Sequence, residues 1–281
     1  MTKKVHLIGN PVEHSISPQI HNAGFKKLGL DYVYSAIKVA DSELEAAANS
    51  MRAADVAGFN VTVPHKQNIM KYLDETDDAS KMIGAVNCVQ NIDGKLKGFN
   101  TDSIGFIESL TLDARQAPKG KKVVVLGAGG SARAVTVALC KEAVADLSIY
   151  DIDSARAKAL AAHLSSEFSM SVSEITDKNT LWQMIINCDI LVNTTPIGMH
   201  PKVNASPIDE DAPLHKGIFV YDVVYNPPLT KLLKIAHEKD ADGMTGLGML
   251  VRQATAAFEL FTGQPAPVEV MWEASKTALG L

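Results

Sequence analysis

The stretch that decides the fold lies at residues 123–132, where an apolar strand runs into a glycine-rich turn: Val123-Val124-Val125-Leu126-Gly127-Ala128-Gly129-Gly130-Ser131-Ala132. The turn has the pattern G-x-G-x-x-A and opens an alanine-rich helix expected over 133–140. Its first glycine permits a tight turn, its second lets the backbone approach a pyrophosphate, and its small final residue lets the helix pack closely. The stretch therefore predicts a dinucleotide site at a helix N-terminus, with a bare strand-to-helix turn as the alternative.

Further apolar runs follow this stretch at the spacing of a parallel βαβ sheet. They cover residues 147–150, 190–193 and 219–222 and are separated by helical segments. Crossovers between such strands are right-handed. The sequence therefore predicts a Rossmann-type doubly wound parallel sheet that carries the dinucleotide.

The second strand of this series ends at Asp151, where a dinucleotide domain places the acid that binds the adenosine ribose hydroxyls. A carboxylate there would repel a 2′-phosphate, and neither Tyr150 nor Ile152 offers a guanidinium, although Arg156 follows. We therefore expect NAD in preference to NADP, with use of NADP left open. The alternative interpretation is that Asp151 or Asp153 only caps the next helix.

The residues before this domain predict a second α/β unit. Strands are expected over 5–8, 32–39, 59–63, 85–90 and 95–99, the last two paired across a turn at 91–94. Helices are expected from Pro18 to Gly29 with Ser17 as cap, from about 41 to 51, over 67–83 and over 104–110. In the strand 59–63, apolar residues alternate with Asn60 and Thr62, which gives that strand a polar face. Helices over 249–261 and 268–278 close the chain.

Composition excludes several classes of protein. The chain has 281 residues, of which 46% are hydrophobic and 21% charged, and a formal net charge of −5. This charge gives no broad basic field, so nucleic acid is not expected as a partner. The three cysteines, Cys88, Cys140 and Cys188, fit neither a disulfide framework nor a zinc pattern. With no signal-peptide core and no membrane span, we expect a cytoplasmic protein; a homodimer stays open.

Several motifs outside the glycine turn occur in a fixed order along almost the whole chain. They are Gly9-Asn10-Pro11-x-x-His14-Ser15-Ile16-Ser17-Pro18, Asn60-Val61-Thr62-Val63-Pro64-His65-Lys66, Gly84-Ala85-Val86-Asn87, Asn100-Thr101-Asp102 and Gly246-Leu247-Gly248-Met249-Leu250-Val251-x-Gln253. Together with the dinucleotide turn, they resemble the shikimate dehydrogenase family. The resemblance implies a substrate-binding catalytic domain at 1–102 plus 243–281, and an inserted dinucleotide-binding domain at 103–242.

The resemblance also implies an activity and roles for residues. The reaction would be the reversible NAD(P)-dependent reduction of 3-dehydroshikimate to shikimate, an oxidoreductase step at a CH–OH group. Lys66 would be the acid/base, because hydride reduction of a ketone needs a proton donor at the carbonyl oxygen, and Asp102 would be its partner. Ser15 and Ser17 would hold the substrate carboxylate. The family positions that hydrogen-bond the substrate are matched further by Thr62, Asn87, Tyr225 and Gln253.

On the cofactor side, the resemblance places the pyrophosphate and ribose at Gly127, Ala128, Gly129, Gly130, Ser131 and Asp151, and the nicotinamide at Thr195, Val223 and Gly246. Asp151-Ile152-Asp153 departs from the Asn-Arg-Thr clasp of NADP-dependent members and resembles NAD-using quinate/shikimate dehydrogenases. The pair Ser15 and Ser17 resembles the shikimate-preferring form, so shikimate ranks before quinate. Whether the enzyme serves aromatic amino acid biosynthesis through the shikimate pathway, or the breakdown of plant acids, stays open.

Each residue also has a plainer interpretation when taken singly. Lys66 would be a solvated lysine, Asp102 a helix cap and Asn87 a turn residue. A metal site could be imagined from His14, His21 and His65 around Asp102, but no spacing typical of zinc is present. No G-x-S-x-G elbow supports a serine hydrolase. A non-catalytic regulator that binds NAD and a hydroxy acid is the remaining alternative.

Overall fold

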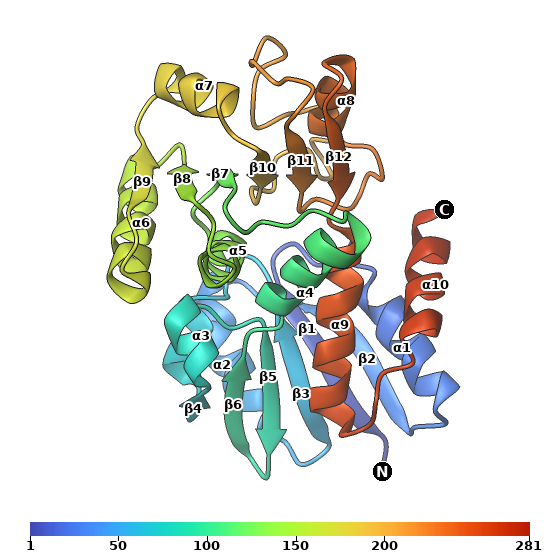
Figure 1. Ribbon diagram of the computed structural model, residues 1–281. Helices are drawn as coiled ribbons and strands as arrows, with labels where there is room; N and C mark the ends of the chain where they lie inside the picture. The colour runs from blue at the N-terminus through green and yellow to red at the C-terminus, as the bar shows by residue number, and fades with distance from the viewer. The chain divides into compact units, whose positions relative to one another are not determined.

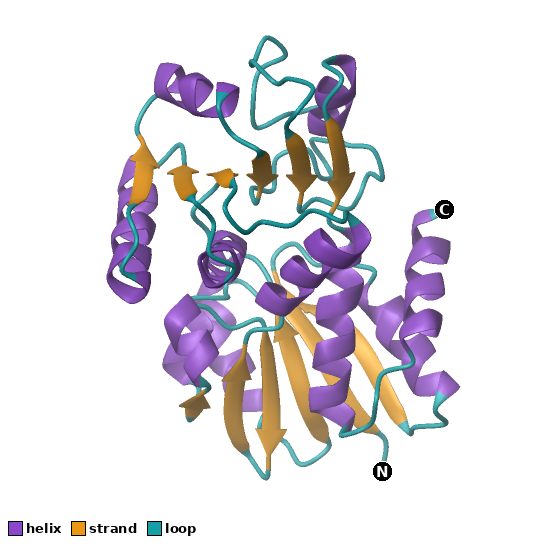
Figure 2. Cartoon of the chain, in the orientation of Figure 1, coloured by secondary structure: helices purple, strands orange, loops and turns teal.

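The computed structural model describes residues 1–281 and divides into two compact units (Figure 1). Unit 1 contains Met1–Gly105 and Val251–Leu281, and unit 2 contains Phe106–Leu250. The expected domain boundaries fall after residues 102 and 242. Helices and strands alternate in both units, as Figure 2 shows, so the α/β fold class is confirmed. None of the helices has the length and hydropathy needed to cross a lipid bilayer.

The sheet of unit 2 has the strand order expected of a doubly wound nucleotide-binding fold. All its neighbouring strands are parallel, in the order β12-β11-β10-β7-β8-β9. The order reverses between β7 and β10, and ligands of such sheets bind at the carboxyl ends of strands at this point. The strands are β7 (Lys122–Leu126), β8 (Asp146–Tyr150), β9 (Val172–Ile175), β10 (Ile190–Asn193), β11 (Phe219–Asp222) and β12 (Asp242–Thr245).

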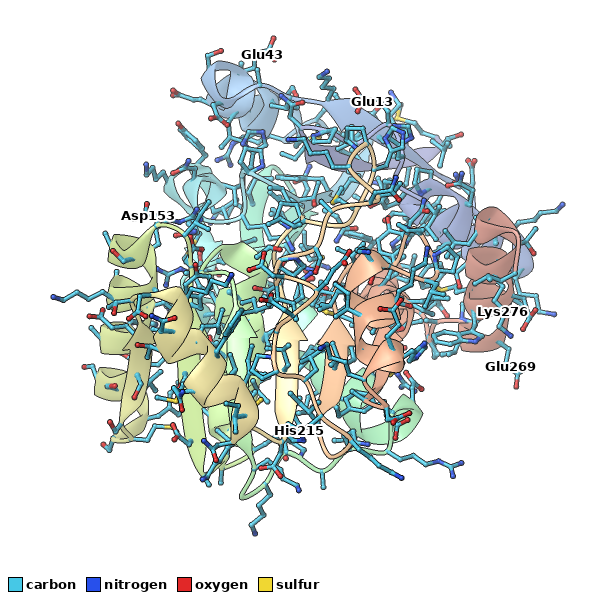
Figure 3. The ribbon with its side chains drawn as sticks, turned by 90° about the horizontal axis from the view of Figure 1, so that it is seen from above. Glu13, Glu43, Asp153, His215, Glu269 and Lys276 are labelled. Carbon is cyan, nitrogen blue, oxygen red and sulfur yellow. The ribbon has the colours of Figure 1, made fainter.

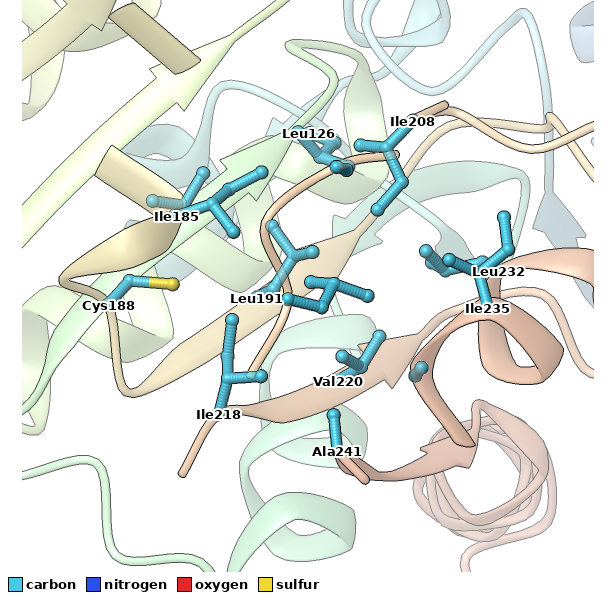
Figure 4. Close-up of a cluster of buried hydrophobic side chains, with 14 of the residues drawn as sticks. Leu126, Ile185, Cys188, Leu191, Ile208, Ile218, Val220, Leu232, Ile235 and Ala241 are labelled. Atoms are coloured by element: carbon cyan, nitrogen blue, oxygen red, sulfur yellow. The ribbon is translucent and has the colours of Figure 1, made fainter. Parts of the chain in front are cut away.

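Helices connect these strands and bury one core between them and the sheet. The cluster includes Leu191 and Val220 from the strands and Ile235 from a covering helix, each at most 1% exposed (Figure 4). Such burial of aliphatic side chains stabilises the unit by roughly 1.5–3 kcal/mol per side chain. The helices of unit 2 are α5 (Gly130–Lys141), α6 (Ser154–Phe168), α7 (Lys178–Ile186) and α8 (Lys231–Glu238), with the end of α4 (Asp102–Glu108) from Phe106 on and the π-helical turn Ser109–Asp113 before them.

The sheet of unit 1 is mixed, in the order β2-β1-β3-β5-β6-β4. Strand β1 pairs in parallel with β2 and β3, whereas β5 is antiparallel to both β3 and β6. The carboxyl ends of β1 and β3 therefore lie at the same edge. The strands are β1 (Lys3–Gly9), β2 (Tyr32–Lys38), β3 (Val56–Val61), β4 (Glu75–Thr76), β5 (Cys88–Ile92) and β6 (Lys95–Phe99).

The helices of unit 1 come from both ends of its sequence: α1 (Ser17–Lys27), α2 (Leu44–Ser50), α3 (Asp78–Ile83), α10 (Val268–Leu279) and, from Val251 on, α9 (Leu247–Thr262). Helix α10 packs beside α1 (Figure 1). The contact needs Gly24, since a Cβ there would lie 2.8 Å from the ring of Phe258 and 3.4 Å from Met271. Close packing on one small residue thus joins the N-terminal and C-terminal segments.

Two local predictions are wrong. The segment expected as one helix over 67–83 forms instead a 3₁₀ turn at Asn68–Tyr72, the short strand β4 and the helix α3. Asp74 interrupts it, because its backbone N–H and its carboxylate both bond to Leu96 on β6. Ser17 does not cap α1 either: Ile16 stands at the N-cap, and Ser17 is the first residue of the helix.

Candidate active site

A lysine and a carboxylate meet in unit 1 although 36 residues separate them in sequence. Lys66 Nζ lies 2.6 Å from Asp102 Oδ2, and their side chains are only 12% and 6% exposed. Lys66 follows β3 through a tight turn, and Asp102 is the first residue of α4, separated from the end of β6 by two residues. A charge pair with so little water around it interacts more strongly than a surface pair. The predicted meeting of these two residues is therefore a feature of the fold.

The amide of Asn87 holds the carboxylate of this pair in place. Its Nδ2 donates to Asp102 Oδ1 at 2.8 Å and to Thr101 Oγ1 at 2.9 Å, while its Oδ1 accepts from the backbone N–H of Thr101 at 2.7 Å. Gln253, from α9, lies on the same network, with its Oε1 3.4 Å from Asn87 Nδ2. Asp102 thus has one oxygen on an amide and the other on an ammonium. Thr101 belongs to this set, and its place beside Asp102 in the motif is the only sequence signal for it.

Ser15 lies in the connection from β1 to α1, and Ser17 is the first residue of α1. The Ser15 hydroxyl donates to Ser17 Oγ at 3.2 Å and accepts from the Ser17 backbone N–H at 3.3 Å. Thr62 follows β3, and its N–H donates to Ile8 O of β1 at 2.9 Å. Gly9 permits this approach, because a Cβ there would clash with the Thr62 methyl group and lie 2.9 Å from Val63 O. The segments after β1 and β3 therefore meet at one edge of the sheet.

Two buried polar residues of the network were not predicted as part of it. Asn60 was expected on a polar strand face, yet it is only 5% exposed, and its Nδ2 donates to Asn87 O at 3.0 Å. The hydroxyl of Tyr34, from β2, donates to Asn60 Oδ1 at 2.9 Å. The alternation along β3 predicted a polar face correctly. It could not predict which other residues bury that face. Nothing in the sequence around Tyr34 distinguishes it from any strand residue.

The histidines do not assemble a metal site. No group of three or more His, Cys, Asp or Glu side chains is arranged to hold an ion. His21 stacks on Tyr34, with ring centroids 4.4 Å apart, and burial lowers its pKa to about 3. His65 Nε2 donates to Val39 O at 2.7 Å. Both rings serve the packing of unit 1.

In unit 2, the glycine turn is built for close approach of the backbone. Gly127 has a φ of +101°, and a Cβ there would lie 2.6 Å from Thr194 Oγ1, so a larger residue is excluded. Gly129 is the N-cap of α5, and Gly130 and Ser131 form the first turn of that helix. The free N–H groups of a helix N-terminus favour an anion. The turn therefore fits a pyrophosphate, as its sequence predicts.

Asp151 braces this turn from the end of β8. Its Oδ2 accepts from the Ala128 N–H at 2.7 Å, and its Oδ1 accepts from the Asp153 N–H at 2.9 Å. Asp153, which Figure 3 labels, caps α6 in place of Asp151. Its carboxylate accepts from the Ala155 N–H at 3.1 Å. Of the two residues considered as caps of this helix, Asp153 is therefore the cap, and Asp151 is not.

Two guanidinium groups stand close to the same turn. Arg156 Nη2 lies 3.7 Å from the position that a Cβ on Gly129 would occupy. Burial, and secondarily the positive charge of Arg156, lower the pKa of Arg133. The positive charge of both arginines is stabilised by an anion bound nearby. Ile152, beside Asp151, is 90% exposed and contributes an apolar surface instead.

The remaining cofactor-side residues lie at the ends of β10 and β11. Asn193 fixes the loop after β10, since its Oδ1 accepts from the Thr195 N–H at 3.0 Å and from the Thr195 hydroxyl at 2.7 Å. Val223 follows β11, and Gly246 packs so closely against it that a Cβ would lie 2.9 Å from Val223 Cα. Thus Thr195 lies on the loop after β10. Val223, after β11, and Gly246, after β12, contact each other. Tyr225, expected at the substrate, lies in unit 2 after β11.

Asp222 ties these loops together, a role that the sequence did not suggest. Its Oδ1 accepts from Asn193 Nδ2 at 2.8 Å and from the Val224 N–H at 3.1 Å, and its Oδ2 accepts from the Thr230 hydroxyl at 2.7 Å. The side chain is completely buried. Desolvation raises its pKa to about 6, although all three hydrogen bonds oppose the rise.

Three family models match successive parts of the chain. Residues 7–89 match the shikimate dehydrogenase substrate binding domain, residues 110–223 match shikimate / quinate 5-dehydrogenase, and residues 246–274 match the shikimate 5′-dehydrogenase C-terminal domain. Together these matches cover most of both units.

Full-length proteins and solved structures are similar to this chain over nearly its whole length. The shikimate dehydrogenase (NADP(+)) of Methanopyrus kandleri is 44% identical over 97% of this chain and 94% of its own. A crystal structure of a shikimate dehydrogenase in complex with NADP⁺ is 39% identical, with a TM-score of 0.89 over 99% of this chain and 96% of that one. The Listeria monocytogenes shikimate 5-dehydrogenase, solved with shikimate and NAD, is 37% identical, with a TM-score of 0.86 over 97% and 96%.

Proposed function

The chain belongs to the shikimate dehydrogenase family, and on this premise we propose that it catalyses the reversible NAD(P)-dependent reduction of 3-dehydroshikimate to shikimate. The observation that carries the proposal is the Lys66–Asp102 pair, shielded from water and held by Asn87. The bound nicotinamide supplies or accepts the hydride. The chain's own residues must then handle the proton, the substrate hydroxyls and the carboxylate.

Lys66 is the proton donor in this proposal. When hydride reaches the ring carbonyl carbon, negative charge develops on the carbonyl oxygen, and an ammonium beside it stabilises that charge and delivers a proton. Asp102 keeps the ammonium oriented and, with Asn87, offers polar groups to a neighbouring substrate hydroxyl. In the oxidative direction, neutral Lys66 takes the proton back. This is acid–base chemistry that requires no group beyond those two side chains and the dinucleotide.

Ser15 and Ser17 hold the substrate carboxylate in this proposal, with Thr62, Tyr225 and Gln253 hydrogen-bonding the rest of the substrate. Hydroxyl groups suit a carboxylate because each donates one hydrogen bond without adding a charge. A site built around substrate hydroxyls rejects analogues that lack them. Shikimate is proposed as the main substrate, and quinate, which the family description also includes, as a secondary one.

For the cofactor we propose NAD in preference to NADP. The carboxylate of Asp151 and the apolar Ile152 support this, because neither would bind a 2′-phosphate. The arginines near the turn and the NADP(+) in the names of relatives favour the opposite choice. Gly127, Ala128, Gly129, Gly130 and Ser131 would hold the pyrophosphate of either dinucleotide, and Thr195, Val223 and Gly246 would surround the nicotinamide.

One kinetic matrix tests these proposals. Shikimate and quinate are each incubated with NAD and with NADP, and the absorbance of the reduced nicotinamide is followed. We expect turnover with shikimate, and a higher kcat/KM with NAD than with NADP. If the nicotinamide is not reduced in any of the four mixtures, although calorimetry shows that a dinucleotide and a hydroxy acid both bind, the protein is instead a regulator without catalytic activity.

A further inference from the structure

A buried carboxylate without a cationic partner lies behind the loops that carry the residues expected at the nicotinamide. Asp222, the last residue of β11, has no exposed surface, so it cannot contact a ligand itself. Its oxygens accept hydrogen bonds from three neutral groups: the Asn193 amide, the Val224 N–H and the Thr230 hydroxyl. Burying a charge among neutral partners is costly, and desolvation accordingly raises the pKa of Asp222 to about 6. Above that pKa the group is ionised and can only accept hydrogen bonds.

The first of these bonds shapes the loop after β10. Asn193 Nδ2 donates to Asp222 Oδ1 at 2.8 Å, and this bond fixes which way the Asn193 amide faces. The amide oxygen is thereby turned to Thr195, whose N–H and hydroxyl donate to it at 3.0 Å and 2.7 Å. Without the carboxylate, the amide could rotate and bring its own N–H groups against these donors. Asp222 therefore determines the conformation of Thr195 through one intermediate side chain.

The second bond shapes the chain after β11. The Val224 N–H donates to the same oxygen, Asp222 Oδ1, at 3.1 Å, which closes an Asx turn around Val223. The Val223 N–H donates in turn to Asn193 O at 2.9 Å. Gly246, after β12, packs directly on this turn, because a Cβ there would clash with the Val223 carbonyl. The residues expected around the nicotinamide are thus held in one arrangement by a single carboxylate oxygen and the contacts that follow from it.

The other half of the proposed dinucleotide site has a brace of its own. Asp151, which follows β8, accepts from the Ala128 N–H of the glycine turn at 2.7 Å and from the Asp153 N–H at 2.9 Å. Asp151 and Asp222 therefore share no hydrogen-bond partner. A change at Asp222 can disturb the nicotinamide side while the turn expected at the pyrophosphate keeps its own support.

We propose that Asp222 is a positioning residue for the nicotinamide half of the dinucleotide, and that binding of the adenosine diphosphate half does not depend on it. This inference rests on the proposed function and deepens it. Hydride transfer needs the nicotinamide ring at a defined distance and angle from the reacting carbon, and a misplacement of about 1 Å can cost about 10²-fold in rate. Loss of the carboxylate should therefore slow catalysis without weakening the grip on the rest of the cofactor.

The test compares Asp222→Ala with Asp222→Asn and with Asp189→Ala, at a pH above the pKa of Asp222. Alanine removes all three hydrogen bonds, whereas asparagine keeps an oxygen for Asn193 and Val224. Asp189 is the matched control, because its carboxylate also joins two parallel strands of the same sheet. It lies directly before β10 and accepts from the Lys122 N–H of β7 at 2.8 Å, so this bond is at the amino ends of the strands.

Two measurements separate positioning from general damage to unit 2. We expect Asp222→Ala to lower kcat with shikimate and NAD about ten- to hundredfold, while Asp222→Asn and Asp189→Ala stay within about threefold of wild type. ADP-ribose, which has no nicotinamide, should bind to all the variants with a dissociation constant within about twofold of wild type, as measured by calorimetry. A merely structural role would weaken ADP-ribose binding as well, and asparagine would not restore kcat.

Three results would overturn the inference while the proposed function stands. They are a kcat of Asp222→Ala equal to that of Asp189→Ala, equal losses of kcat in Asp222→Ala and Asp222→Asn, and an ADP-ribose affinity that falls together with kcat. A wild-type enzyme without shikimate turnover would overturn both. If thermal unfolding shows that Asp222→Ala does not fold, Asn193→Ala, which removes the donor to Asp222 and the acceptor of Thr195, replaces it under the same criteria.

Discussion

At the scale of single residues, the proposed chemistry depends on a charge pair that water barely reaches. The ammonium of Lys66 and the carboxylate of Asp102 neutralise each other at 2.6 Å, and Asn87 satisfies the second carboxylate oxygen. Removing one partner of such a pair leaves the other charge buried and uncompensated, which destabilises proteins by about 3–5 kcal/mol. A variant of Lys66 must therefore be judged on both stability and rate.

Lys66→Ala is expected to lower kcat about 10²- to 10⁴-fold, the usual contribution of a general acid, and to change the KM for shikimate far less. Lys66→Arg should stay nearly as slow, because a guanidinium keeps the charge but does not release its proton. Steady-state kinetics measure both. Lys71→Ala is the control, since Lys71 lies on an exposed turn and reaches only Asn68. A kcat that survives in Lys66→Ala would remove the lysine from the mechanism.

Cofactor choice is the second property that single residues determine. Replacing Asp151 by Asn and Ile152 by Arg should shift the ratio of kcat/KM toward NADP by about tenfold or more, because a guanidinium binds a phosphate with two parallel hydrogen bonds. Asn keeps an oxygen for the Ala128 N–H, so the turn should survive. Ile186→Arg adds the same charge to the exposed surface of α7 and serves as the control. If the ratio does not move, Arg133 and Arg156 set the preference instead.

At the scale of elements, the carboxyl ends of β10 and β11 are joined by one buried carboxylate. Asp222 binds Asn193, which shapes the loop after β10, and Thr230, which caps α8. The residues expected around the nicotinamide lie on or beside these loops. The geometry of this part of unit 2 therefore depends on the hydrogen bonds that Asp222 accepts.

Asp222 makes the stability of unit 2 depend on pH. Its pKa of about 6 in the folded protein lies above the 3.8 of an unperturbed carboxyl, so the folded state holds the proton more tightly. Its contribution to stability is thus complete below about pH 4 and is lost as pH rises through 6. Asp222→Asn should remove this dependence and gain, relative to wild type, up to about 3 kcal/mol between pH 4 and pH 7. Urea unfolding across this range measures it; parallel profiles for the two proteins would contradict it.

The same scale shows how far sequence patterns reach. Strand β7, the glycine turn and α5 could be predicted because every signal for them is local. Strands β9 and β12 were not predicted, because neither of their sequences, VSEI and DGMT, is an apolar run. Both strands depend on pairing with their neighbours in the sheet. The periodicity over 67–83 predicted a helix, but the hydrogen bonds of Asp74 to β6 interrupt it. In the site, motif order brought Lys66 and Asp102 together, whereas Tyr34 carries its role only through the fold.

At the scale of the whole molecule, the two units differ in whether they are built from one continuous segment of the chain or from two separate ones. Unit 2 is one continuous segment, and its doubly wound sheet contains the predicted dinucleotide turn. Unit 1 is discontinuous: its sheet comes from the first 105 residues, but α10 and most of α9 come from after unit 2. Gln253 on α9 and Asn87 on the sheet side share one hydrogen bond network, so the proposed catalytic pair draws on both segments.

This arrangement has a consequence for biosynthesis. A nascent chain emerges from the ribosome in order, and domains generally fold as units once their sequence is available. Unit 2 is fully translated while the partners of α1 are still missing, so Gly24 and the rings of Phe25 and His21 await Phe258 and Met271. The N-terminal sheet must stay competent to fold during that interval. Premature termination after residue 250 would leave a nucleotide-binding unit whose companion lacks its aromatic cover.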